Sequence, residues 1–302
     1  MQSLDFSGER AAMVRHQLHG RGIQGPAVLY AMSRVPRELF VPEGLGEFAY
    51  EDTALEIGAG ETLPQPWIVA AMVEALDLSG IEHVLDVGTG SGYTAAVAAC
   101  IADRVVSVER HAGLAERARA ALARAGSANV EVHVGDGGPG WPREAPYDAI
   151  MVGAGARRVP PALKEQLRIG GRLVMPVGAN PAVQELIRVT RLSASEFRSE
   201  TIADVRFEPL DGAEGGSPET AAEDAAADIS RFDLALSERI AGVAESFDAI
   251  EDLPLDGLLE RIGNSRIVLL GEASHGTSEF YRTRDWITRA LIPRAGPLTM
   301  VT

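Results

Sequence analysis

The sequence has one cysteine, no long apolar run and no surplus of basic residues, and each absence excludes a class of protein. The single Cys100 rules out an internal disulfide and a cage of thiolate ligands for a metal. Its position in the apolar run 95–102 predicts a small buried side chain. No stretch reaches the roughly 18 apolar residues of a membrane-spanning helix, and the chain starts without a signal-peptide pattern. We therefore expect a cytoplasmic protein with no membrane partner and no metal.

Acidic side chains outnumber basic ones in this chain. There are 43 acidic side chains against 28 lysines and arginines, a net charge of −15. Nucleic-acid binding needs a basic surface that neutralises phosphates, so nucleic acid is excluded as a partner. The apolar fraction of 46% and the charged fraction of 24% are those of an ordinary globular protein.

Short apolar runs alternate with amphipathic helical patterns through most of the chain. The strand-like runs lie at 84–87, 105–108, 131–134, 147–152 and 172–177. The helical patterns lie at 9–34 (broken at 20–25), 67–78, 92–102, 112–125 and 160–168, and 44–66 is rich in loop residues. Two further strand-like runs, 183–190 and 200–207, follow without a helix between them. This order predicts a doubly wound α/β fold, Rossmann-like, whose mainly parallel sheet has antiparallel edge strands.

The composition changes after residue 210. Residues 211–228 contain six acidic side chains, no basic one and few large apolar ones, which is typical of a linker. Helical patterns at 229–248 and 255–262 and a strand-like run at 266–271 follow. The sequence thus predicts a domain at 1–210, an acidic linker at 211–228 and a small, incomplete α/β segment at 229–302.

A glycine-rich turn between a strand and a helix is the strongest chemical signal. It contains Asp86 at the end of the strand, followed by Gly88, Thr89, Gly90, Ser91 and Gly92. Glycines let the backbone approach a ligand closely, and a helix N-terminus favours negative charge. Dinucleotide-binding loops space their glycines as G-x-G-x-x-G. Here the third glycine comes one residue earlier, and the pattern resembles that of class I S-adenosylmethionine-dependent methyltransferases.

Two carboxylates at the ends of the next strands support a bound nucleoside. Glu109 follows Gly88 by 21 residues, where an acidic side chain can accept hydrogen bonds from both ribose hydroxyls. Asp136, followed by Gly137, ends the third strand and can accept from the adenine amino group. Alternatively, these carboxylates are solvated strand-end residues, or the nucleoside belongs to a nicotinamide dinucleotide.

Other motifs resemble one methyltransferase family. They are V-P-R-E-L-F-V at 35–41, G-D-G with G-W at 135–141, the glycine-rich strand at 170–178 and V-R-F-E-P-L at 205–210. Together they resemble the protein-L-isoaspartate O-methyltransferases over about residues 8–210. The resemblance implies S-adenosyl-L-methionine as cofactor. It also implies methyl transfer to the free carboxylate of L-isoaspartyl and D-aspartyl residues, which begins the repair of damaged proteins.

The segment that corresponds to the family's active-site loop departs from the family pattern. That loop reads T-[IL]-S-x-P in the family, with a serine where donor and acceptor meet, whereas this chain has Pro64 at the serine position. Proline has neither a hydroxyl nor a backbone N–H, and it fixes φ. Thr62 or Gln65 then takes the serine's role, or the serine only orients the acceptor. Two further alternatives are a different carboxylate acceptor and a module that binds the cofactor without turnover.

A second resemblance lies near the C-terminus. The run 267–281 contains Glu272 and His275 and resembles the opening motif of the erythromycin esterase family, where the matching histidine acts as a base toward water. The similarity covers only about residues 229–292 and lacks the family's remaining catalytic groups. We therefore expect an esterase-like remnant without hydrolytic activity.

Overall fold

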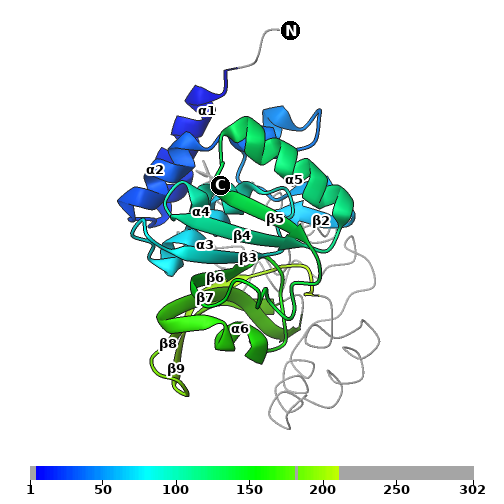
Figure 1. Cartoon of the computed structure of the whole chain (residues 1–302). Coiled ribbons are helices and arrows are strands. Elements are labelled where there is room, and N and C mark those ends of the chain that lie inside the picture. The colour runs from blue at the N-terminus through cyan, green and yellow to red at the C-terminus, as the bar shows by residue number, and fades with distance from the viewer. Residues whose placement is uncertain (1–4, 181–182, 211–302) are drawn as a thin grey trace, which may run out of the picture. The chain divides into compact units, whose positions relative to one another are not determined.

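The fold is built around one twisted sheet with helices on both faces (Figure 1). The computed structural model describes residues 5–180 and 183–210. In these residues seven strands lie in the order β5-β4-β3-β6-β7-β8-β9. The parallel strands are β3 (His83–Val87), β4 (Arg104–Glu109), β5 (Val130–Val134), β6 (Tyr147–Val152) and β7 (Leu167–Asn180); β8 (Val183–Arg191) and β9 (Phe197–Val205) pair antiparallel at one edge. The predicted fold class is confirmed.

The strand order reverses beside β3. The chain runs outward from β3 to β5, returns to place β6 next to β3, and then continues in the opposite direction. Ligands of open α/β sheets bind at such a switch point, beyond the carboxyl ends of the strands. The sequence places its glycine-rich turn at this point, directly after Val87.

Side chains alternate between the two faces of the sheet because successive residues of a strand point to opposite sides. On one face Val84, Val105 and Met151 pack with Met72 and Leu76 of α3 (Pro66–Leu76). The opposite face contributes a second cluster, which includes Leu163 of α6 (Pro161–Glu165). The two helices that follow β3 and β4 are α4 (Tyr93–Ala99) and α5 (Ala112–Ala125).

The N-terminal segment packs as a separate helical layer. Its elements are α1 (Ser7–Ala12), the π-helix η1 (Met13–Leu18), the 3-10 helix η2 (His19–Arg21), α2 (Pro26–Arg34) and the 3-10 helices η3 (Arg37–Phe40) and η4 (Gly46–Phe48). Met13, Leu18 and Met32 of this layer are buried in one cluster with residues of α3, α4 and α5. The break predicted at 20–25 overlaps the interval 22–25 between η2 and α2, and residues 20 and 21 belong to η2.

Three predictions about local structure were wrong. The segment 44–66 contains a hairpin of β1 (Leu55–Gly58) and β2 (Glu61–Leu63), which are too short to show a period in the sequence. The helix predicted at 160–168 ends at Glu165, and β7 begins at Leu167 with a register shift against β6. Cys100 is exposed because it lies at the C-cap of α4, where the helix ends at the surface.

No helix among the described residues has the length and apolar character needed to cross a bilayer. The predicted linker at 211–228 and the segment 229–302, with Glu272 and His275, lie outside the described residues.

Candidate functional site

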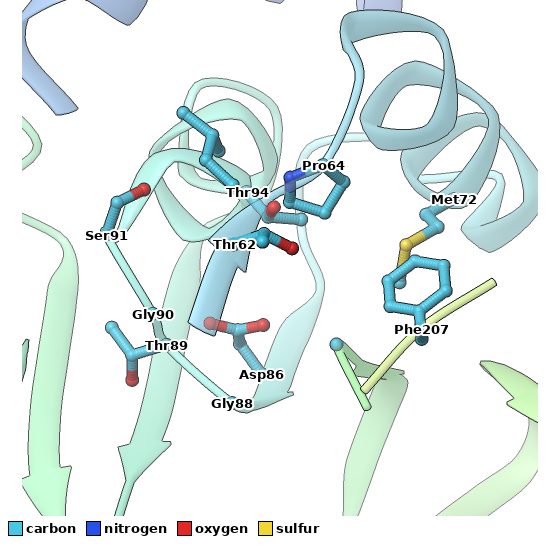
Figure 2. A pocket seen from close by; sticks show the side chains of 12 residues that line it. Thr62, Pro64, Met72, Asp86, Gly88, Thr89, Gly90, Ser91, Thr94 and Phe207 are labelled. Atoms are coloured by element: carbon cyan, nitrogen blue, oxygen red, sulfur yellow. The ribbon is translucent and has the colours of Figure 1, made fainter. Parts of the chain in front are cut away.

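A pocket opens at the switch point, between the glycine-rich turn and the β1–β2 hairpin (Figure 2). It brings together several of the predicted site residues from segments far apart in the sequence. The lining residues are Thr62, Leu63, Pro64, Met72, Asp86, Gly88, Thr89, Gly90, Ser91, Thr94, Gly153 and Phe207. Thr62 and Pro64 lie across the pocket from Asp86 and the turn (Figure 2).

The glycine-rich turn wraps tightly around the end of β3. The amide of Gly88 donates to the carbonyl of Val108 (2.9 Å), and the amide of Gly92 donates to the carbonyl of Thr89 (2.8 Å). Gly88 and Gly90 have φ of 88° and 54°, values that other residues adopt only with strain. Because Gly88 and Gly90 have no side chains, the backbone at these two positions is open to a ligand, and the side chains of Thr89 and Ser91 also line the pocket.

Asp86 is a buried carboxyl in the lining of the pocket. Ser107 Oγ donates to Asp86 Oδ2 (2.6 Å) and lies 2.5 Å from Thr89 Oγ1, so a chain of hydroxyls connects the carboxyl to the turn. The pKa of Asp86 is raised to about 7, mainly because the carboxyl is buried; the Ser107 hydrogen bond lowers the pKa and the nearby Glu109 raises it, and both effects are included in that value. This carboxyl is therefore ready to lose a proton when a cation arrives.

Glu109 holds the glycine-rich turn in place through a hydrogen bond to its backbone. Its Oε2 accepts from the amide of Gly90 (2.8 Å) and its Oε1 from the amide of His111 (2.9 Å), and the residue is 4% exposed. Glu109 and Gly92 are not among the lining residues of the pocket. The sequence predicted Glu109 as an acceptor for the ribose hydroxyls, and it gave no sign of these two hydrogen bonds to the protein's own backbone.

Asp136 and Gly137 lie in the loop after β5, and neither lines the pocket. Asp136 Oδ1 accepts from the amide of Gly138 (2.9 Å), which forms a local turn. A Cβ at Gly137 would lie 2.4 Å from Cγ1 of Val87, so only glycine allows this loop to pack on the end of β3. The structure thus places the loop beside the turn.

The loop that contains Pro64 connects the β1–β2 hairpin to α3. Leu55 pairs with Leu63, and α3 begins at Pro66, so the segment between them is held at both ends. Thr62 and Pro64 line the pocket, whereas Gln65 Nε2 donates to the carbonyl of Asp52 (3.2 Å). Of the two side chains expected to replace a serine, only Thr62 lies at the pocket.

Five lining residues were not predicted from the sequence. Leu63 comes from β2, Met72 from α3 and Thr94 from α4, while Gly153 directly follows β6 and Phe207 lies in the segment after β9. Phe207 belongs to the V-R-F-E-P-L motif, which was the one available signal for its importance. The others are brought to the pocket only by the fold.

The seven-stranded sheet, the turn after its first parallel strand and the acidic residues beside that turn define a class I S-adenosylmethionine-dependent methyltransferase fold. The protein-L-isoaspartate(D-aspartate) O-methyltransferase family matches the chain over residues 9–215. The chain belongs to this family.

Curated relatives agree with the family match. The chain is 55% identical over 210 residues to protein-L-isoaspartate O-methyltransferase 1 of Rhodopseudomonas palustris strain HaA2, covering 70% of this chain and 86% of the relative. It is 56% identical over 211 residues to protein-L-isoaspartate O-methyltransferase 2 of Marinobacter nauticus, covering 70% of this chain and 96% of the relative.

Solved structures share the same fold. A protein-L-isoaspartate O-methyltransferase is similar at a TM-score of 0.62 and 29% identity, covering 68% of this chain and 67% of that chain. A Plasmodium falciparum structure in complex with S-adenosyl-L-homocysteine gives a TM-score of 0.57 at 23% identity, covering 69% and 99%. The second comparison shows the fold alone.

Proposed function

We propose that the chain transfers a methyl group from S-adenosyl-L-methionine to the free carboxylate of L-isoaspartyl and D-aspartyl residues in damaged proteins. The observation that carries this proposal is the pocket in which the Thr62–Pro64 loop faces Asp86 and the glycine-rich turn. Family membership and the similarity to curated relatives support the reaction and the substrate.

The pocket suits a cationic, nucleoside-bearing cofactor. The buried Asp86 carboxyl offers a counter-charge, and the open backbone of Gly88–Gly92 leaves room for the cofactor's amino-acid part. Glu109 is proposed to accept from the ribose hydroxyls, and Asp136 with Gly137 to lie near the adenine. S-adenosyl-L-methionine supplies a methyl group on a sulfonium that leaves as a neutral thioether.

The chain's own residues then need only align and enclose the reactants. An acceptor carboxylate has a reference pKa near 4 and is already ionised at neutral pH, so no base is required. Alignment and exclusion of water supply most of the acceleration. Thr62 Oγ1 is the side-chain hydroxyl that the loop offers to orient the acceptor, since Pro64 offers none and Gln65 contacts Asp52.

The experiment that tests the proposal compares methyl transfer to an isoaspartyl peptide with transfer to its aspartyl isomer. We expect selective transfer by the wild type and a rate roughly ten- to a hundredfold higher in Pro64→Ser. A hydroxyl bond to a charged acceptor stabilises by about 1–3 kcal/mol, and 1.36 kcal/mol is a factor of ten. The companion variant Thr62→Val, which keeps Pro64, is expected to transfer the methyl group more slowly than the wild type.

Selectivity should be unchanged in Pro64→Ser, because it depends on the pocket and not on one hydroxyl. Cofactor binding without transfer by either variant would favour the binding module, and transfer to both peptides would indicate a different carboxylate acceptor. A faster wild type would show that the loop with proline has a different working geometry.

Replacement of Glu109 by Ala is expected to weaken binding of S-adenosyl-L-methionine about tenfold to a hundredfold. The change removes the proposed ribose acceptor and leaves the Gly90 amide without its partner, and hydrogen bonds to charged groups contribute roughly 1.5–3 kcal/mol. Calorimetric titration of Glu109→Gln, which keeps one acceptor oxygen, should give an intermediate affinity. Wild-type affinity in Glu109→Ala would refute the assignment.

The remaining proposals concern the C-terminal part of the chain. The family match ends at residue 215, before Glu272 and His275, so the division into a domain at 1–210, a linker and a segment at 229–302 rests on the sequence. We propose that the esterase-like segment adds no hydrolytic activity.

A further inference from the structure

The arginine of the V-P-R-E-L-F-V motif is buried next to the loop that contains Pro64. Arg37 is 0% exposed, and no ion pair involves its guanidinium among the residues the structure describes. Its Nη1 has no hydrogen-bond partner there either. A buried guanidinium without a carboxylate is costly, because the charge is removed from water without compensation. Burial accordingly lowers the pKa of Arg37.

The contacts of Arg37 connect the two sides of the pocket. Nη2 donates to the carbonyl of Pro64 (2.7 Å), and Nε donates to the carbonyl of Ala49 (2.7 Å). The guanidinium also lies over the ring of Tyr93, 4.9 Å from its centroid. Tyr93 is the first residue of α4, directly after Gly92 of the glycine-rich turn. The rigid, planar guanidinium of Arg37 thus contacts both the Pro64 loop and Tyr93, the first residue after the glycine-rich turn.

We propose that Arg37 is a positioning residue for methyl transfer, which sets the spacing between the Pro64 loop and the glycine-rich turn. This inference rests on the proposed function. Arg37 holds the Pro64 carbonyl with one edge of its guanidinium and rests on the Tyr93 ring with its face. In-line transfer requires donor and acceptor to meet at one distance and angle, and a misplacement of 1 Å costs about a hundredfold in rate.

Stability alone does not account for this side chain. An apolar side chain of similar length would fill the same volume without removing a charge from water, which is commonly neutral or stabilising. The Pro64 carbonyl is an acceptor in a loop that has lost a backbone donor to proline, so Arg37 supplies a fixed point from outside the loop.

The test compares Arg37→Met and Arg37→Lys with the wild type on an isoaspartyl peptide. We expect Arg37→Met to lower kcat about a hundredfold, with KM for the peptide and the Kd of S-adenosyl-L-methionine changed less than about threefold. A loss in kcat alone indicates an interaction needed in the transition state. Lysine reaches only one carbonyl, so Arg37→Lys should recover about tenfold of the loss.

Arg10→Met is the matched control. Arg10 donates to the hydroxyl of Tyr50 (2.7 Å), which also accepts from the backbone amide of Arg37 (3.1 Å), whereas the hydrogen bond to the Pro64 carbonyl comes from Arg37. It should change the melting temperature and leave kcat within about twofold. Hydrogen–deuterium exchange across residues 55–65 adds a readout that does not depend on activity, and it should speed up in Arg37→Met alone.

Wild-type kcat in Arg37→Met, or an equal loss of kcat in Arg10→Met, would overturn the inference. If the wild type transfers no methyl group to isoaspartyl peptides, the proposed function fails. The exchange experiment then still decides the role of Arg37: unchanged exchange at 55–65 in Arg37→Met refutes it, and faster exchange confined to that hairpin supports it.

Discussion

Replacement of Asp86 by Asn is expected to weaken binding of S-adenosyl-L-methionine about a hundredfold at pH 8. The change keeps the size of the side chain and removes the one acidic group among the described residues that line the pocket. Charged hydrogen bonds contribute roughly 1.5–3 kcal/mol, and 3 kcal/mol corresponds to somewhat more than a hundredfold. Titration calorimetry of the two proteins measures the difference.

The wild type should also release a proton on binding. Because burial raises the pKa of Asp86 to about 7, the free protein holds a proton there below pH 7, and the cation displaces it. Affinity should therefore fall toward tenfold per pH unit as the pH drops below 7. Calorimetry in two buffers of different ionisation enthalpy detects the proton, and Asp86→Asn should show neither effect.

Ser107→Ala is the control for this prediction. It removes the hydrogen bond that lowers the pKa of Asp86 while keeping the carboxyl, so the pH at which affinity begins to fall should move upward. Wild-type affinity and pH dependence in Asp86→Asn would show that the cofactor's charge is met elsewhere.

The Asp86 carboxyl also makes the free energy of unfolding depend on pH. Its pKa is about 7 in the folded chain, against the ordinary aspartate pKa of 3.8 in the unfolded chain. Between these values the folded chain holds a proton that the unfolded chain has lost. This group's contribution to the free energy of unfolding is thus fully present below about pH 4 and is lost as the pH rises through 7.

The second large effect is expected at Gly92, where replacement by Ala should lower the free energy of unfolding by about 2–5 kcal/mol. The residue has a φ of 90°, and a Cβ there would lie 3.3 Å from Ala118 Cβ and 3.3 Å from Leu122 Cγ of α5. The left-handed backbone costs about 1–2 kcal/mol outside glycine, and overpacking adds about 1–3 kcal/mol. Urea denaturation measures the loss.

Gly126→Ala isolates the backbone part of this cost. Gly126 has a φ of 76° at the end of α5, and a Cβ there meets nothing within 4 Å. The free energy of unfolding of Gly126→Ala should therefore fall by only about 1 kcal/mol. If Gly92→Ala and Gly126→Ala lose the same free energy of unfolding, then steric contact with α5 does not contribute to the cost of a side chain at position 92.

Those parts of the fold that depend on local pattern were predicted from the sequence. The buried strand ending at Asp86 and the glycines after it lie together in the chain, so their pairing with a pocket needs no long-range information. The helix at 112–125 also has the predicted bounds, because its apolar face repeats over nearly four turns.

The parts that depend on tertiary contacts were not predicted. The β1–β2 hairpin is stable only against the rest of the domain, and its strands of four and three residues carry no periodic signal. Arg37 is of a residue type that is normally exposed, and its burial follows from carbonyls supplied by Ala49 and Pro64. Gln65 was expected at the reaction centre, but its side chain hydrogen-bonds the Asp52 carbonyl.

The two prolines that flank Gln65 have a thermal consequence. Each removes a freely rotating φ from the unfolded chain, so ordering the segment between β2 and α3 costs less conformational entropy than it would with serine at position 64. Replacement of Pro64 by Ser should therefore raise the conformational entropy that is lost on folding, and this entropic cost to the free energy of unfolding grows with temperature.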